Sequence, residues 1–142
     1  MTADTDTLAP TAEAEMDEKR MRVVLVDARK DRRSVMRQVF EHSGVDATVV
    51  AEADTGADAV ALVEEHHAHV AVVELPSPLE EGLATVAELR RRLPDLAIVV
   101  ISFAGDAAIK DAALAGGADA YLVKPVSARE VVAAVPTPPV SE

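Results

Sequence analysis

Residues 22–27 read Arg-Val-Val-Leu-Val-Asp, and residues 70–74 read Val-Ala-Val-Val-Glu. Each stretch is a short apolar run that ends on a carboxylate, and an amphipathic segment follows each of them. Runs of β-branched residues of this length are typical of buried parallel strands. Strands that alternate with amphipathic segments favour a parallel sheet whose crossover connections are helices. The two stretches therefore indicate an α/β fold.

The same alternation along the chain predicts five strands and five helices. The strands are expected at Val23–Asp27, Thr48–Ala53, Val70–Glu74, Ala97–Ser102 and Ala120–Val123. Four helices are expected at about Asp31–Ser43, Ala57–His67, Gly82–Leu93 and Asp106–Ala115. A fifth is expected to begin after Ser127, a good N-cap residue, and to end at Pro136 after barely two turns.

The composition of the 142 residues fits one domain of ordinary size with short extensions. Residues 1–21 are acidic and lack an apolar period, so we expect a tail that is disordered unless a partner holds it. Residues 22–135 form the predicted domain, and residues 136–142 form a Pro-rich end. The absence of cysteine, of a signal peptide and of a membrane-spanning apolar stretch favours a soluble cytoplasmic protein.

Several functional classes are disfavoured by charge and by missing motifs. A formal net charge of -11 opposes binding to DNA or RNA, because neutralising phosphates needs clustered Lys and Arg. No Gly-x-Gly-x-x-Gly follows the first strand, no P-loop occurs, and no serine lies in a nucleophile elbow. We therefore expect that the protein is not an enzyme.

Polar residues close four of the predicted strands. They are Asp27, Glu74, Ser102 and Lys124, and the carboxyl ends of parallel strands form one edge where ligands collect. The Lys124-Pro125 step fits a tight bond, which a cis peptide would allow, and would aim the lysine inward. Two acids, a hydroxyl and a lysine around one crevice are what a phosphate site requires.

The chain resembles the response-regulator receiver domain, of the CheY-like kind, over roughly residues 22–135. The motifs that carry the resemblance are Val-Leu-Val-Asp-Ala at 24–28, Glu-Leu-Pro-Ser-Pro-Leu-Glu-Glu-Gly at 74–82, Val-Val-Ile-Ser at 99–102 and Ala-Gly-Gly-Ala-Asp-Ala-Tyr-Leu-Val-Lys-Pro at 115–125. The resemblance implies a three-layer, doubly wound α/β sandwich with a five-stranded parallel sheet in the order 2-1-3-4-5.

The family's chemistry gives each position an implied role. In receivers an acidic pair after the first strand helps to hold magnesium, and an aspartate after the third strand attacks the phosphorus of the donor. A hydroxyl and a lysine, here Ser102 and Lys124, then bind the phosphoryl oxygens. An aromatic residue on the fifth strand, here Tyr121, swings inward when the hydroxyl moves.

Two departures fall on this chemistry. Ala28 replaces the second acid of the pair, so we expect at most weak magnesium binding and no other cofactor. Glu74 replaces the acceptor aspartate, and its extra methylene misplaces the nucleophile, so phosphotransfer should be very slow or absent. Glu74 either imitates the phosphorylated state or forms a simple buried ion pair with Lys124.

Three further groups of residues each allow a functional interpretation and a purely structural one. The Glu64-Glu65-His66-His67-Ala68-His69 stretch is expected to be a solvated helix end rather than a metal site. Arg29, Arg33 and Arg37 share a helix face by their spacing of four, and they form either a docking patch for an acidic partner or a solvated face. Arg90, Arg91 and Arg92 are expected to be solvent residues that complement a helix dipole.

The short last helix is expected to leave Val131, Val132 and Val135 thinly covered, which would mark a partner surface. We therefore expect a phosphorylation-independent interaction module, an adaptor or accessory subunit that binds a protein or a large protein complex. The alternatives are a stand-alone response regulator of a two-component phosphorelay and, less favoured, a small-molecule site at the degenerate phosphate pocket.

The resemblance extends to one named partner. The composition, rich in Ala, Val and Arg, looks actinobacterial, and the chain resembles stand-alone atypical receivers of that group. One of these is similar to an accessory subunit of respiratory NADH dehydrogenase. The resemblance thus suggests a cytoplasmic protein at the inner side of a membrane complex, without insertion into the membrane.

Overall fold

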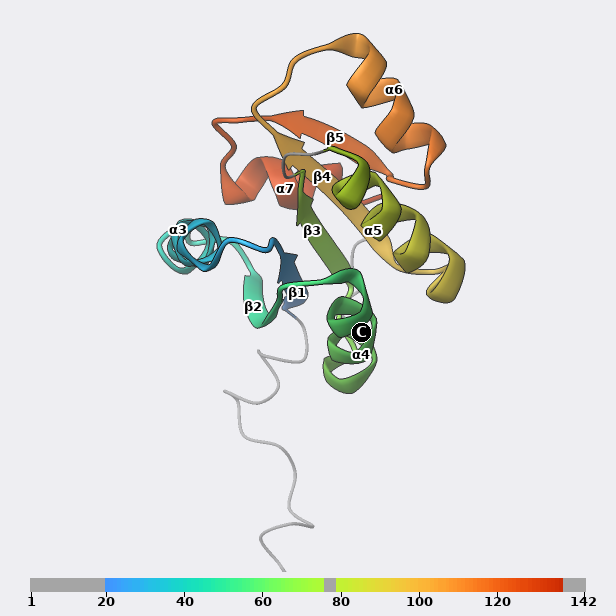
Figure 1. Cartoon of the computed structure of the whole chain (residues 1–142). Helices are drawn as coiled ribbons and strands as arrows, with labels where there is room; N and C mark the ends of the chain where they lie inside the picture. The colour runs from blue at the N-terminus through green and yellow to red at the C-terminus, as the bar shows by residue number, and fades with distance from the viewer. Residues whose placement is uncertain (1–19, 76–78, 137–142) are drawn as a thin grey trace, which may run out of the picture.

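Five parallel strands form one sheet in the order β2-β1-β3-β4-β5 (Figure 1). They are β1 (Met21–Val26), β2 (Ala47–Ala53), β3 (Val70–Glu74), β4 (Ala97–Ser102) and β5 (Ala120–Val123). This structure, a computed structural model, describes residues 20–75 and 79–136. The predicted strand order is confirmed, whereas most of the predicted tail and of the Pro-rich end lies outside the described residues.

Helices cover both faces of the sheet. They are α3 (Lys30–Glu41), α4 (Gly56–His66), α5 (Leu79–Arg92), α6 (Ala107–Ala115) and α7 (Ala128–Ala134). α3 and α7 pack on one face, and α4, α5 and α6 pack on the other, which confirms the predicted three layers (Figure 1). In the described part of the chain, no helix is long and apolar enough to cross a membrane.

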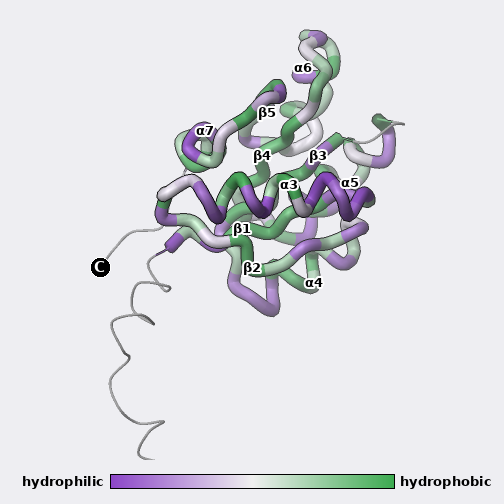
Figure 2. Tube along the Cα trace, turned by 90° about the vertical axis from the view of Figure 1, so that its left-hand side faces the viewer, coloured by the Kyte–Doolittle hydropathy of each residue, from purple (hydrophilic) through white to green (hydrophobic). Residues whose placement is uncertain are grey.

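The core follows from the two-residue period of the strands. On β1, Val24 and Val26 face the α4 side, whereas Val23 and Leu25 face the α3 side. All five residues of β3 are buried, as expected for a central strand with helices on both faces. Figure 2 shows this as green strands behind α3, whose turns alternate between purple and green.

The first strand begins earlier than the sequence pattern predicts. β1 starts at Met21, two residues before Val23 and within the segment assigned to the tail. Met21 is only 2% exposed, and its N–H donates to the carbonyl of Asp46 at 2.9 Å. Pairing with the start of β2 thus extends the domain by these residues.

The last helix is as short as predicted, but it does not leave its valines uncovered. Ser127 Oγ accepts a hydrogen bond from the Glu130 N–H, and the Glu130 carboxylate accepts one from the Ser127 N–H. This capping box fixes the start of α7. Val131 and Val135 are 0% and 5% exposed, so the expectation that they form an exposed partner surface was wrong. The two valines are four residues apart, about one helical turn, so both side chains lie on the side of α7 that packs on the sheet.

Arg90 is not the solvent residue that the run of three arginines suggested. Its guanidinium donates to the carbonyls of Pro94, Leu96 and Gly117 at 2.7–3.0 Å. It also pairs with Asp119 at 2.8 Å. Gly117 has φ +123°, and a Cβ there would lie 2.7 Å from the Arg90 Cβ, so both the conformation and the close approach require glycine. Arg90 therefore ties the end of α5 to the loop before β5.

The histidines near the end of α4 have separate roles. His67 ends the helix in the left-handed conformation at φ 52°. His69 Nδ1 accepts a hydrogen bond of 2.8 Å from the backbone N–H of Arg22. Burial and the charge of Arg22 lower the pKa of the His69 imidazole. An unprotonated Nδ1 is needed for this bond, so His69 links the start of β3 to β1 only in its neutral form.

We predict that His69 makes stability depend on pH. Because its folded pKa is lowered, its contribution is fully present above the unfolded pKa of about 6.5 and is lost as the pH falls through that value toward the folded pKa. His69→Asn keeps an acceptor but does not titrate, so its free energy of unfolding should decline less than that of the wild type between neutral and mildly acidic pH. Urea unfolding at several pH values measures this. His67→Asn is the matched control, and equal pH slopes for all three proteins would contradict the prediction.

Candidate functional site

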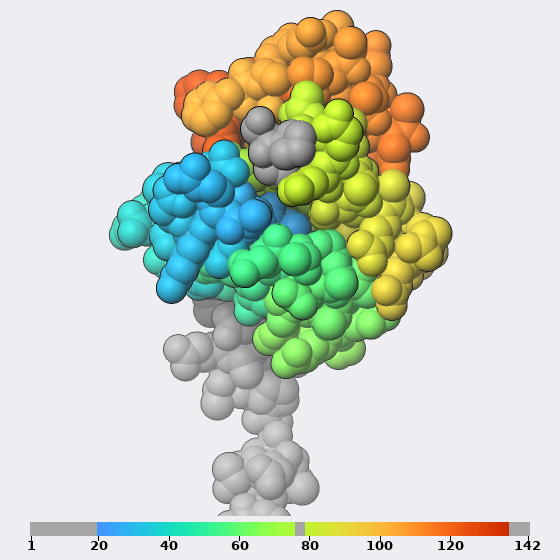
Figure 3. Space-filling model, viewed as in Figure 1, coloured from blue at the N-terminus to red at the C-terminus, as the bar shows by residue number. Residues whose placement is uncertain are grey.

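Four predicted residues meet at the carboxyl edge of the sheet. Glu74 and Ser102 are the last residues of β3 and β4, and Asp27 and Lys124 directly follow β1 and β5. The Lys124 N–H donates to the Ser102 carbonyl at 2.8 Å, which fixes the end of β5 beside β4. Figure 3 shows the same side of the molecule as Figure 1, with α3 in blue and α4 in green.

Glu74 and Lys124 are in direct contact. The Lys124 Nζ binds Glu74 Oε2, and the two side chains are 13% and 6% exposed. The Lys124-Pro125 peptide is cis, as the sequence analysis allowed. Burial lowers the pKa of the Lys124 ammonium and the charge of Arg32 acts in the same direction, while Asp27 opposes both. The Glu74 carboxylate in contact favours the charged ammonium.

Arg32 is the functional residue that sequence reasoning did not single out. It lies in the first turn of α3, and its guanidinium binds Asp27 through two contacts of 3.0 Å, Nε to Oδ2 and Nη2 to Oδ1. Its Nε also lies 3.9 Å from Glu74 Oε2. Arg32 thus lies between the two carboxylates. Only its position five residues after Asp27 signalled this, and the spacing does not tell which way the side chain points.

The charges at this edge form an alternating series: Lys124, Glu74, Arg32 and Asp27. Two positive and two negative groups make the series neutral. Because an unpaired buried charge costs several kcal/mol, each member depends on its neighbours. We call these four residues the charge series.

Ser102 and Tyr121 lie next to the charge series. Ser102 is 5% exposed, and its Oγ accepts a hydrogen bond of 3.0 Å from the Ala104 N–H. Tyr121 is 8% exposed, and its hydroxyl donates to the Ala104 carbonyl at 2.6 Å. The aromatic ring is therefore turned inward and packs in the core on the α4 and α5 side.

Arg29, Arg33 and Arg37 do not form one exposed patch. Arg33 is 9% exposed and binds Glu52 on β2 at 3.0 Å, and Arg37 binds the same carboxylate. Burial opposes ionisation of Glu52, but the hydrogen bonds from Arg37 and Arg33 outweigh it and lower the pKa of this carboxyl. Arg33 and Arg37 thus point at β2 rather than at solvent, so of the three only the exposed Arg29 remains available for the predicted docking patch.

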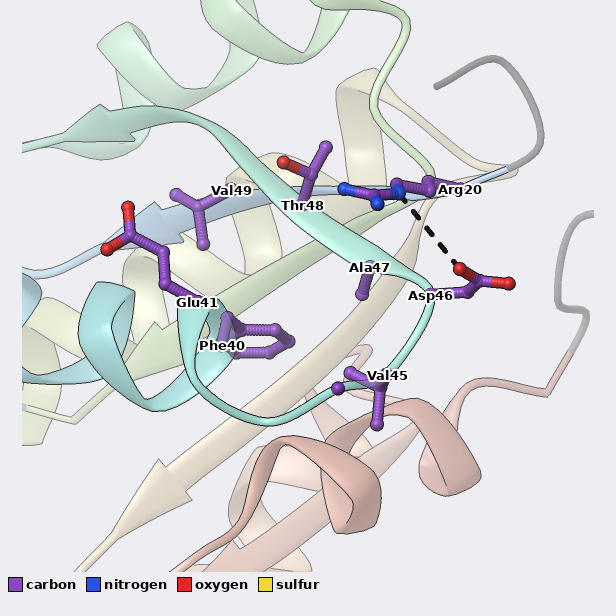
Figure 4. A pocket seen from close by; sticks show the side chains of 9 residues that line it. Arg20, Phe40, Glu41, Val45, Asp46, Ala47, Thr48 and Val49 are labelled. Atoms are coloured by element: carbon purple, nitrogen blue, oxygen red, sulfur yellow. Dashed lines mark ion pairs between the residues drawn. The ribbon is translucent and has the colours of Figure 1, made fainter. Parts of the chain in front are cut away.

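Little space adjoins the two carboxylates of the charge series. The two cavities that adjoin both Asp27 and Glu74 among the described residues have volumes of about 10 and 40 Å³. A larger cavity of about 270 Å³ lies at the amino end of β2, where Arg20 and Asp46 form an ion pair of 4.0 Å (Figure 4). That cavity is at the opposite end of the strands from the charge series, and its acids Glu41 and Asp46 are exposed.

Among the described residues, no group of three or more His, Asp or Glu is arranged to hold a metal ion. The histidines near α4 diverge, since His66 lies 3.8 Å from Glu65 while His69 binds the backbone of β1.

Residues 23–136 match the family model of the response regulator receiver domain. The chain belongs to this family. Among curated relatives, the transcriptional activator DevR/DosR of Mycobacterium tuberculosis is 36% identical over 118 residues, covering 81% of this chain and 52% of that protein. The chemotaxis protein CheY of Bacillus subtilis is 27% identical over 114 residues, covering 80% of this chain and 93% of CheY.

Solved receiver structures show the same fold. The signal receiver domain of the response regulator NarL from Mycobacterium tuberculosis superimposes with a TM-score of 0.69 at 31% identity, covering 82% of this chain and 93% of that chain. The chain spans about half the length of the first curated relatives that it matches, such as DegU of Brevibacillus brevis at 51%. The similarity therefore concerns the receiver domain of those proteins.

The residues of this receiver domain do not fit the magnesium ion that the family implies. Ala28 supplies no carboxylate. Asp27 Oδ1 already accepts hydrogen bonds from the Arg29 N–H at 2.8 Å and from Arg32 Nη2 at 3.0 Å, and Arg32 Nε lies 3.0 Å from Oδ2. Magnesium requires near-octahedral oxygen ligands at about 2.0–2.1 Å. A guanidinium in contact with the carboxylate does not leave that geometry free.

Removing one partner of the Glu74–Lys124 pair should destabilise the receiver domain. We predict that Lys124→Met lowers the free energy of unfolding by about 3 kcal/mol, because Glu74 remains buried without its ammonium and Arg32 compensates only in part. Glu74→Leu/Lys124→Met should recover much of the loss. Chemical unfolding at neutral pH measures both. Lys110→Met on the exposed side of α6 is the control, and a loss no larger than in this control would refute the prediction.

Proposed function

We propose that this receiver domain is a protein-interaction module that acts without phosphorylation, as an adaptor or accessory subunit of a larger assembly. The observation that carries the proposal is the contact between Glu74 and Lys124. The lysine that the family uses to bind a phosphoryl group is already bound to the side chain at the acceptor position. The ammonium that would bind a phosphoryl group is thus already engaged.

The surroundings of the pair support the same proposal. Arg32 lies between the two carboxylates in place of a metal ion, and Tyr121 is turned inward and hydrogen-bonded to Ala104. In receivers an inward aromatic residue accompanies the signalling state. We therefore propose that Glu74 imitates the phosphorylated state and keeps the surface in one form.

A groove beside the charge series is the proposed docking surface. Its volume is about 440 Å³. Its apolar walls are Val35, Met36 and Val39 of α3, Phe103 after β4, and Pro125 and Val126 after Lys124. We call it the α3–Phe103 groove. Phe103 and Val35 are 74% and 63% exposed, large values for apolar side chains. An apolar segment of a partner protein is the occupant that these walls favour.

The partner is proposed from the resemblance alone. Respiratory NADH dehydrogenase is the named candidate, and an actinobacterial origin with a cytoplasmic location beside that complex belongs to the same proposal. Enzymatic activity is not part of it. RpfG of Xanthomonas campestris, 32% identical, is a cyclic di-GMP phosphodiesterase response regulator, but the match covers only 30% of that protein.

A stand-alone response regulator of a phosphorelay is the second candidate. It is favoured by the match to 93% of CheY of Bacillus subtilis and by the retention of Asp27, Ser102 and Lys124. A small-molecule ligand at the pocket is the weakest alternative, since the cavities of about 10 and 40 Å³ have room for little more than one or two water molecules.

Treatment with acetyl phosphate and magnesium separates the first two candidates. We predict no added phosphoryl mass on the intact protein, because Glu74 is engaged by Lys124 and displaced from in-line geometry. A receiver domain with an aspartate at the acceptor position, treated in parallel, shows that the reagent is active. A phosphoryl group that the wild type gains and that Glu74→Gln abolishes would instead establish the response-regulator candidate.

The α3–Phe103 groove should be required for partner binding. We predict that Phe103→Ser abolishes co-purification of one defined protein set, because it removes the most exposed apolar wall, while leaving the melting temperature nearly unchanged. Affinity purification from the source organism with quantitative mass spectrometry measures the loss. Leu114→Ser on α6 is the matched control, being an exposed apolar residue outside the groove. Identical protein sets for both variants and the wild type would contradict the prediction.

A further inference from the structure

We propose that Arg32 is the resident cation of this receiver domain and replaces the divalent metal ion. The inference deepens the proposed function and rests on it for its biological meaning, but metal binding can be measured without any partner or phosphoryl donor. Its basis is the position of the guanidinium, 3.0 Å from Asp27 and 3.9 Å from Glu74.

The contacts of Arg32 place its guanidinium among the carboxylates of the pocket rather than in solvent. Its Nε and the Asp27 Oδ2 are buried atoms 3.0 Å apart that have no hydrogen-bond partner among the described residues, so they contact each other as an ion pair. Arg32 Nη2 donates a charge-assisted hydrogen bond of 3.0 Å to Asp27 Oδ1, and the Nε–Oδ2 ion pair of 3.0 Å adds a second contact between the same two groups. A neighbouring arginine gives the contrast, since Arg29 pairs with the exposed Asp31 at the surface.

The charge count leads to the same conclusion. With Arg32 and Lys124 present, Asp27 and Glu74 are already balanced, so an incoming divalent cation meets no net negative charge. Without Arg32 the pocket keeps two carboxylates and one ammonium and becomes an anionic site. Arg32 therefore both fills the position and removes the attraction for a metal ion.

Ala28 and Arg32 both make the pocket less negative. Ala28 lies exposed at the end of β1, where a second carboxylate would add negative charge and a metal ligand. With alanine there, Arg32 and Lys124 together suffice to neutralise the two carboxylates that remain. The absent acid and the added base thus produce one result, a pocket whose cation is part of the chain.

The test is a titration of the full chain with MgCl₂, followed residue by residue in two-dimensional ¹H–¹⁵N NMR spectra. For the wild type we expect no saturable change in the amides of Asp27, Ala28 and Glu74. Arg32→Ala should show saturable binding at these amides, with an affinity at least about tenfold higher, because a positive charge a few ångströms from the ion has been removed. Local detection separates this site from weak binding elsewhere on a chain of net charge -11.

Two further variants keep the test decisive. Arg32→Met retains the apolar stem, so it should also gain magnesium binding and remain folded where alanine does not. Arg29→Ala is the matched control and should gain none, because Arg29 pairs with the exposed Asp31. Saturable magnesium binding to the wild type at Asp27 and Glu74, or no gain in either Arg32 variant, would overturn the inference.

Adding the missing acid identifies which residue excludes the metal ion. Ala28→Asp alone should bind magnesium much more weakly than Ala28→Asp/Arg32→Ala. If Ala28→Asp alone restored full affinity, Arg32 would not be the excluding group, and the inference would be wrong. The proposed function fails on a different result, namely phosphorylation of Glu74, so the two can be judged separately.

Discussion

The contact between the Glu74 carboxylate and the Lys124 ammonium is the constraint on which the rest of the site depends. It joins the central strand β3 to the end of the edge strand β5, and Arg32 extends it to Asp27 at the end of β1. Charges buried to this degree are tolerated only when they are paired. The four side chains therefore hold one another in position. The end of β5, the first turn of α3 and the carboxyl edge of the sheet are fixed together.

The sheet could be predicted from the sequence because burial on both faces leaves a strong local signal. A strand such as β3 must be apolar throughout, and a break in that pattern marks its end. The start of β1 was missed because Met21 continues the strand only through its pairing with β2, a contact distant in sequence. The burial of Val131 and Val135 was missed for the same reason, since the length of α7 does not tell where it packs.

The candidate site could be predicted only in part. Glu74, Ser102 and Lys124 were found because strand ends converge wherever a parallel sheet forms. The arginines of α3 were not, because their spacing groups them on a face without telling whether that face meets solvent or β2. Arg33 and Arg37 bind Glu52, which no local pattern connects to them. The role of Arg32 could not be predicted for the same reason, because only the folded chain brings its guanidinium between two carboxylates.

The charge series and the α3–Phe103 groove share side chains, which ties the chemistry of the pocket to the surface. Arg32 and Lys124 line the groove as well as binding Asp27 and Glu74. The Lys124 ammonium also lies 4.8 Å from the centre of the Phe103 ring. In a phosphorylated receiver the arriving phosphoryl group recruits the lysine and so reshapes its surroundings. Here Glu74 already holds that lysine, and on this contact rests our proposal that the form of the groove is set by the sequence rather than by a signal.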